Sequence, residues 1–190
     1  SIDIRYSSGT ITAYAFSGSS SFSRSGSAAQ NSWHHIAWVR DGSAMRLFIN
    51  GTQTAGTSNI STNSINDSSE PFGVGALGSG GYRMTGYLSN VRLVKGRALY
   101  TSNFTPPRKK LEATSDTVLL TCEKGTIRDR SPSAHAITIN GDAKSISGAS
   151  YFEFDGTNDY VSISSSNDFA FGTSDFTIEF WAYFQGSGSY

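Results

Sequence analysis

Apolar and polar residues alternate with a period of two along most of the chain. The apolar positions are largely β-branched or aromatic, and clusters of Gly, Ser, Asn and Asp separate the alternating runs. This pattern is typical of many short strands, because successive side chains of a strand point to opposite faces of its sheet. It predicts strands at Ile2–Tyr6, Thr10–Phe16, Ser32–Arg40, Ala44–Asn50, Pro71–Ala76, Gly86–Val94, Thr117–Cys122, Ala136–Ile139, Tyr151–Phe154, Tyr160–Ile163 and Phe176–Phe184.

Turn-forming residues indicate how some of these strands connect. Asp41-Gly42-Ser43 and Asn50-Gly51 each follow a predicted strand, and such residues readily adopt the positive φ of hairpin turns. We therefore expect two consecutive hairpins. Ser17–Ser27 and Thr54–Ser69 are rich in Ser, Thr, Asn and Gly, which indicates surface loops or sheet-edge segments.

The stretch after residue 95 has a different character. Gly96–Ser102 is the one predicted helical turn, and Pro106-Pro107 then favours an extended exit into a linker, because proline cannot donate to a ladder. Basic residues gather here, and we interpret them as a solvated strand edge and linker, since edge lysines oppose aggregation. They are Arg92, Lys95, Arg97 and Arg108-Lys109-Lys110.

An antiparallel protein of this length must hide its sheet faces, and two stacked sheets with one shared core do so. We therefore predict an all-β antiparallel sandwich. In Phe176–Phe184, one face (Phe176, Ile178, Phe180, Ala182, Phe184) is predicted to be core. The other face carries Glu179 together with Trp181 and Tyr183. It is either a sugar-stacking surface or an outer sheet face covered by loops.

Composition narrows the function classes. The 190 residues suit one domain, and 15 basic residues balance 15 acidic ones. A net charge of zero argues against a nucleic-acid binder, which needs a basic stripe to neutralise phosphates. No apolar run approaches the roughly 20 residues that span a bilayer. The start at Ser1, with neither Met nor a signal peptide, indicates a piece of a longer polypeptide or a processed product.

The sequence offers no convincing catalytic arrangement, and we expect no enzyme. Glu153 and Asp155 share one strand face, but Asp155 before Gly156 is more simply a turn residue. The histidine spacing does not resemble a zinc site. Cys122 is the only cysteine, and we interpret it as a buried, inert thiol.

Three stretches are similar to the laminin-G-like, concanavalin A-like jelly-roll family, in the version found in tail and surface proteins of phages and bacteria. Residues 33–42 with 47–51 resemble the central strands of the family and their turn. Residues 86–96 with 98–107 resemble the closing strand and exit. Residues 154–161, followed by 169–181, resemble its opening.

The order of these stretches is permuted, because the opening motif lies at the carboxyl end. We expect either a tandem array cut in mid-repeat or a circular permutant. Residues 1–113 would be the rear of a sandwich, 114–149 a connecting segment and 150–190 the front strands of the next or same sandwich, one compact domain overall. The apolar face of Phe176–Phe184 must then be met by its own chain near Ser1–Tyr6, with Tyr190 close to Ser1, or by a neighbouring chain. We favour closure within one chain.

The resemblance implies non-catalytic binding of carbohydrate or another surface ligand, within a larger virion or cell-surface protein. Neighbouring repeats and other virion or surface proteins would be its partners, and its location would be the virion surface or extracellular. The alternative is a purely structural repeat or decoration domain. Relatives often bind calcium in rim loops, and oxygen ligands are available at Asp155, Asn158 and Asp159 and at Asn66-Asp67, where all could instead be turn formers.

Aromatic and amide groups that could hold a sugar are plentiful. Trp33 and Trp38 fall on opposite faces of their strand, so at most one lies in the core. Trp38 shares its face with Arg40, a mixture that favours a groove, and Tyr82-Arg83 follows a glycine run at a predicted loop tip. The predicted ligand-binding residues are Trp38, Arg40, Tyr82, Arg83, Trp181 and Tyr183.

Overall fold

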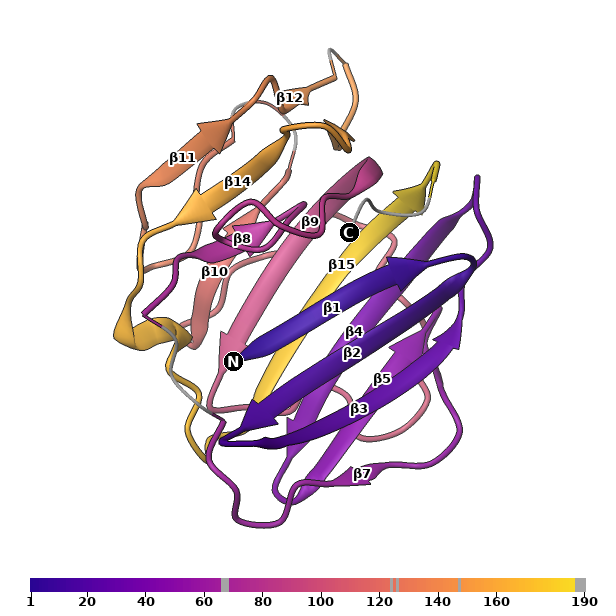
Figure 1. Ribbon diagram of the computed structural model, residues 1–190, viewed down its shortest axis with the longest axis vertical. Helices are drawn as coiled ribbons and strands as arrows, with labels where there is room; N and C mark the ends of the chain where they lie inside the picture. Colours follow the sequence, from indigo (N-terminus) through magenta and orange to yellow (C-terminus); the bar gives the residue numbers. More distant parts are fainter. Residues whose placement is uncertain (66–68, 124, 126, 147, 187–190) are drawn as a thin grey trace.

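Two layers of antiparallel strands form the protein in the computed structural model, which describes residues 1–65, 69–123, 125, 127–146 and 148–186 (Figure 1). The helical structure in this part of the chain is one 3-10 turn, η1 (Asn167–Phe169). The strands are β1 (Ile2–Ser7), β2 (Thr10–Ser17), β3 (Ser20–Ser27), β4 (Trp33–Asp41), β5 (Ala44–Ile49), β6 (Thr52–Gln53), β7 (Ser58–Asn59), β8 (Phe72–Val74), β9 (Thr85–Lys95), β10 (Thr117–Thr121), β11 (Ile137–Asn140), β12 (Lys144–Ser145), β13 (Phe152–Asp155), β14 (Tyr160–Ile163) and β15 (Phe176–Phe184).

The back layer is a nine-stranded sheet in the order β12-β13-β9-β15-β4-β5-β6, with β10 paired to β9 and β7 paired to β5. Its middle strand is β15, which pairs along its length with β4 on one side and β9 on the other. Residues from the carboxyl end of the chain therefore complete a sheet whose other central strands come from its first half (Figure 1).

The front layer consists of two separate three-stranded sheets, β1-β2-β3 and β11-β14-β8. The first lies across β15, β4 and β5, and the second lies beside it, over β9 and β10 (Figure 1). The edge strands β1 and β8 face each other across the gap between the two sheets, and a cavity opens there.

The core lies between the layers and follows the predicted alternation. Trp38, Phe152, Phe154 and Phe176 are among its largest fully buried side chains. On β15 the face predicted as core is buried apart from Phe180, which is half-buried. The all-β antiparallel sandwich predicted from the sequence is confirmed.

Each of the eleven predicted strands overlaps a strand of the structure, and both predicted hairpins are present. The serine-rich stretch predicted as a loop or sheet edge contains β3, which is the outer strand of its sheet. The predicted helical turn at Gly96–Ser102 is wrong, because this segment is irregular. Its backbone is held by the neighbouring sheet, as described below.

The apolar face of β15 is covered by residues of its own chain in this structure. The Phe184 ring stacks on Tyr6 of the front layer, with centroids 3.9 Å apart. The hydrogen-bonding partners of β15, however, are β4 and β9, and not residues 1–6. The predicted neighbour Tyr190 lies outside the described residues.

Candidate functional site

A long irregular segment covers the middle of the outer face of the back sheet. We call residues 96–112 the outer cover. Tyr100 and Phe104 of this cover stack on each other, with centroids 3.6 Å apart, and pack with Phe48 of β5. Gly51 lies so close to the Phe104 carbonyl that a Cβ would overlap it, and its φ of 76° favours glycine as well. The cover therefore seals this part of the face.

A buried polar cluster lies under the cover, centred on Glu179 of β15, which is 0% exposed. Its carboxylate accepts hydrogen bonds from Tyr100 Oη at 2.8 Å and from Arg92 Nε at 2.9 Å, and His35 Nε2 lies 3.1 Å from Oε2. Arg92 comes from the basic cluster interpreted above as solvated. That interpretation is wrong for this residue, because Arg92 forms a largely buried ion pair.

Electrostatics keep the Glu179 carboxylate charged. Burial alone would raise its pKa, but the hydrogen bond from His35 and the charge and hydrogen bonds of Arg92 outweigh burial and lower the pKa below its usual value. Burial and the neighbouring Glu179 raise the pKa of Tyr100. The side chains of Glu179 and His35 are both fully buried, and we assign the cluster a structural role.

The outer cover ends beside an aromatic surface at one end of the same sheet face. Tyr183 of β15 lies opposite Trp33 of β4 on one side and opposite Tyr87 of β9 on the other. Tyr151, which precedes β13, contacts both Trp33 and Tyr87, at centroid distances of 5.5 Å and 5.0 Å. These four residues, here called the aromatic row, span the sheet from β4 to the start of β13.

The aromatic row is accessible to solvent. Trp33 is 37% exposed, and the three tyrosines are half-buried. Polar groups border the rings, since Gln185 Nε2 donates to Tyr87 Oη at 3.4 Å and Glu153 of β13 lies opposite Tyr87. Aromatic surface with a few polar groups at its border is the composition of many ligand-binding sites.

Two of the predicted binding residues lie in the core. The groove predicted at Trp38 is wrong, because Trp38 is 0% exposed and its strand face points between the layers. Arg40 is 1% exposed, and its guanidinium donates to the carbonyls of Gly42 and Gly172 at 3.0 Å and 2.9 Å. Arg40 therefore holds two loops together and is unavailable to a ligand.

The other four predicted residues lie nearer to solvent, but the structure does not bring them together. Trp181 is half-buried beneath the outer cover, and its indole Nε1 donates to the Pro107 carbonyl at 3.2 Å. Tyr183 belongs to the aromatic row. Tyr82, which is 40% exposed, and the half-buried Arg83 line the cavity of the front layer instead.

Sequence reasoning missed three members of the aromatic row, namely Trp33, Tyr87 and Tyr151. The alternation showed that Trp33 and Trp38 face opposite ways, which left a signal for Trp33 once Trp38 was assigned to the core. No comparable signal exists for Tyr87 and Tyr151, because only the strand order places them beside Trp33 and Tyr183.

One part of the expected calcium site has the right kind of ligands. Carboxylate oxygens of Asp142, Asp155 and Asp159 lie within 4.8 Å of one another. Asp159 already accepts the backbone N–H groups of Asp142 and Asp155, and Asp155 accepts that of Thr157, as expected of turn formers. Calcium binding here stays a prediction, and Asn66-Asp67 lies outside the described residues.

Comparison with protein-family models gives one match, over residues 1–102, more than half of the chain. Its description is the concanavalin A-like lectin/glucanases superfamily, in a laminin G-type branch. The chain belongs to this superfamily. The match confirms the resemblance drawn from the sequence, and it includes Trp33 and Tyr87, whereas Tyr151 and Tyr183 come from the unmatched remainder. Searches of curated proteins and of solved structures found no match.

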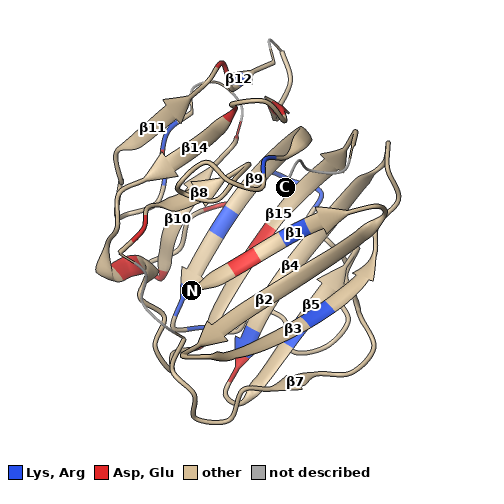
Figure 2. Ribbon diagram, in the orientation of Figure 1, with Lys and Arg blue, Asp and Glu red and all other residues tan. Residues whose placement is uncertain are grey.

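Membership in the concanavalin A-like superfamily indicates the function in general terms only. Laminin G-type domains are generally non-catalytic binding modules and are typically extracellular or displayed at surfaces. The described residues contain no helix long and apolar enough to span a membrane. Charged residues of both signs occur in both layers, so the charge pattern indicates no single class of charged ligand (Figure 2).

Proposed function

We propose that this protein is a carbohydrate-binding module and that its ligand lies on the aromatic row. One observation carries the proposal: Trp33, Tyr183 and Tyr87 occupy neighbouring positions on three adjacent strands, at the end of the face that the outer cover leaves open. A rigid sheet holds the rings in place before any ligand arrives, so little conformational entropy is lost on binding.

The rings form a surface of mutually tilted planes. Each ring plane is tilted between 49° and 60° from its neighbours in the row. Such a surface offers apolar contact to the C–H faces of a sugar, while Tyr hydroxyls and the neighbouring Gln185 can hydrogen-bond its hydroxyl groups. We expect weak binding by a single module, raised by avidity if modules are repeated on a virion or cell surface.

The experiment is a glycan array followed by titration calorimetry with the best glycan. Trp33→Ala is expected to weaken binding by about tenfold or more, because it removes the largest exposed ring of the row. Tyr82→Ala is the matched control, since Tyr82 is similarly exposed but lies in the front layer. The affinity of the Tyr82→Ala variant for the glycan should stay unchanged.

Two outcomes would contradict the proposal. The first is the absence of any glycan signal at high protein concentration, which would favour a purely structural domain. The second is a glycan whose binding is lost in Tyr82→Ala but kept in Trp33→Ala, which would move the site to the front layer.

A further inference from the structure

The carboxyl end of the outer cover carries three exposed basic residues in a row, residues 108–110. Their backbone is held on both sides. Trp181 Nε1 donates to the Pro107 carbonyl at 3.2 Å, and the N–H of the buried Leu111 donates to Asn90 Oδ1 at 3.1 Å. The three basic side chains therefore belong to a segment that is fastened to the back sheet at each end.

This segment lies alongside the aromatic row. Trp181 and Tyr183 are two residues apart on β15 and share its outer face, which places them about 6.6 Å apart along the strand. Trp181 lies opposite Ser89 of β9, as Tyr183 lies opposite Tyr87. The first anchor of the segment is on Trp181, and the second is on the residue that follows Ser89. Residues 108–110 therefore run from β15 toward β9 along the border of the row.

Two of the three positive charges are available to a ligand. Lys110 Nζ lies 3.4 Å from the carboxylate of Glu123, which is 2% exposed and also forms an ion pair with Arg130. Arg108 and Lys109 form no ion pair with any residue that the structure describes. We call Arg108 and Lys109 the basic pair.

The acidic residues near the row do not cancel the basic pair. Glu153 lies opposite Tyr87, and Lys144 Nζ lies 3.6 Å from its carboxylate. Glu112 is the only acidic residue of the outer cover, and it follows the anchor at Leu111. Charges of both signs are distributed over the molecule as a whole (Figure 2), but the border of the row along the cover is positive.

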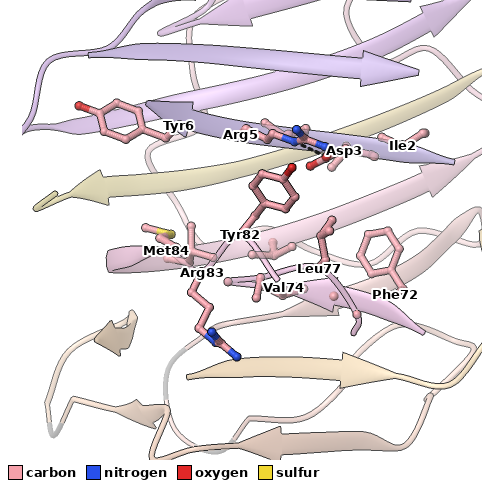
Figure 3. A pocket seen from close by; sticks show the side chains of 18 of the residues that line it. Ile2, Asp3, Arg5, Tyr6, Phe72, Val74, Leu77, Tyr82, Arg83 and Met84 are labelled. Carbon is pink, nitrogen blue, oxygen red and sulfur yellow. Dashed lines mark hydrogen bonds and ion pairs between the residues drawn. The ribbon is translucent and has the colours of Figure 1, made fainter. Parts of the chain in front are cut away.

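The front-layer cavity, with a volume of about 520 Å³, also combines an exposed aromatic residue with an arginine. Figure 3 shows Asp3, Arg5 and Tyr82 at this cavity. Arg5 forms an ion pair with Asp3, and its guanidinium lies 4.0 Å from the centre of the Tyr82 ring. The charge of Arg5 is therefore compensated within the chain, in contrast to the charges of the basic pair.

We propose that the ligand of the aromatic row is a negatively charged glycan, whose carboxylate, sulfate or phosphate groups bind Arg108 and Lys109 while its sugar rings lie on the row. This inference rests on the proposed function and names the class of glycan. The planar guanidinium of Arg108 matches an acidic group with two parallel hydrogen bonds, and Lys109 adds a second positive charge. A neutral glycan would contact the rings and leave both charges unused.

The test compares matched glycans that differ in charge, using the whole chain at low salt. The pairs are oligogalacturonate and its methyl ester, dextran sulfate and dextran, and phosphomannan and mannan, which distinguish a carboxylate, a sulfate and a phosphate. We expect the charged member of at least one pair to bind about tenfold more tightly than its neutral partner. Raising NaCl from about 0.05 M to about 0.5 M should remove most of this difference, because salt screens exposed charges.

A double variant tests the basic pair directly. Arg108→Gln with Lys109→Gln removes both charges and should weaken binding of the charged glycan by about fivefold to tenfold, with no change for its neutral partner. The matched control is Arg97→Gln, because the Arg97 side chain is 49% exposed and lies at the other end of the outer cover. The control should bind both glycans as the parent does. Equal thermal midpoints of the parent and the double variant check that the variant is folded.

Two results would overturn this inference and leave the proposed function standing. In the first, the glycan array yields a neutral ligand, and the charged members of the pairs bind no more tightly than the neutral ones. In the second, the double variant keeps full affinity for a charged glycan whose binding Trp33→Ala weakens. The absence of binding by any glycan would instead contradict the proposed function and this inference together.

Discussion

The same three strands carry two contrasting regions on the outer face of the back sheet. Under the outer cover, β4, β15 and β9 contribute His35, Glu179 and Arg92. Toward the other end of the same strands they contribute Trp33, Tyr183 and Tyr87. The first region is charged and largely buried, whereas the second is aromatic and open to solvent.

The difference shows that chemistry alone does not mark a functional site in this protein. A carboxylate with a histidine, an arginine and a tyrosine around it has the composition of an active site, yet the outer cover buries the carboxylate and the histidine completely. The cover is anchored from below, since Thr177 Oγ1 accepts the Leu99 N–H at 2.9 Å and Arg92 donates to the Glu112 carbonyl at 3.0 Å. The polar cluster thus fastens the cover, and the aromatic row lies where the cover ends.

The largest effect is expected from Glu179→Gln. Removing one partner of a buried ion pair leaves the other charge uncompensated, and this costs about 3–5 kcal/mol of unfolding free energy. Urea denaturation at neutral pH measures the loss. Glu153→Gln is the control, because its ion pair with Lys144 is partly exposed and should be worth about 0.5 kcal/mol or less. Equal losses of unfolding free energy in both variants would contradict the contrast between the buried region and the exposed one.

Low pH should destabilise the fold by protonating the Glu179 carboxylate under the outer cover. Because the folded pKa of Glu179 is lowered from the usual 4.5, its contribution is fully present above 4.5 and is lost as pH falls through the lower folded pKa. His35, Arg92 and Tyr100 are the ionisable groups that contact it. The difference in stability between the parent and Glu179→Gln should therefore stay constant above pH 4.5 and shrink as the pH falls below 4.5. A difference that stays constant with pH would mean that Glu179 is not held as a carboxylate.

Much of the fold was predictable because it depends on local pattern. The period of two located eleven strands, and Asn50-Gly51, with φ values of 53° and 76°, marked a turn that is indeed a tight hairpin. The core face of β15 was also predictable, since five alternating apolar residues leave little choice. These features can be predicted without knowing which strands become neighbours in the sheet.

The candidate site was not predictable in the same way. Strand β4 is buried on both faces over most of its length, so alternation separated Trp33 from Trp38 without showing which one meets solvent. Arg40 made the Trp38 face look polar, and its burial depends in part on the carbonyl of Gly172, which lies 132 residues away in sequence. The outer cover looked like a helical turn and linker because its anchors, such as Thr177 and Glu179, lie some 80 residues away in sequence.

The smallest effect on folding is expected from Trp33→Ala. Trp33 contacts Tyr183 and Tyr151 on one side and solvent on the other, so its loss removes cross-strand contacts without opening a core cavity. We expect a loss of about 1 kcal/mol in unfolding free energy, measured by the same urea denaturation. A loss comparable to that of Glu179→Gln would show that the aromatic row supports the fold as the buried cluster does. A small loss of unfolding free energy together with weakened glycan binding would instead show that the two regions have different roles. The exposed rings would then contribute to ligand binding, and the buried cluster to folding.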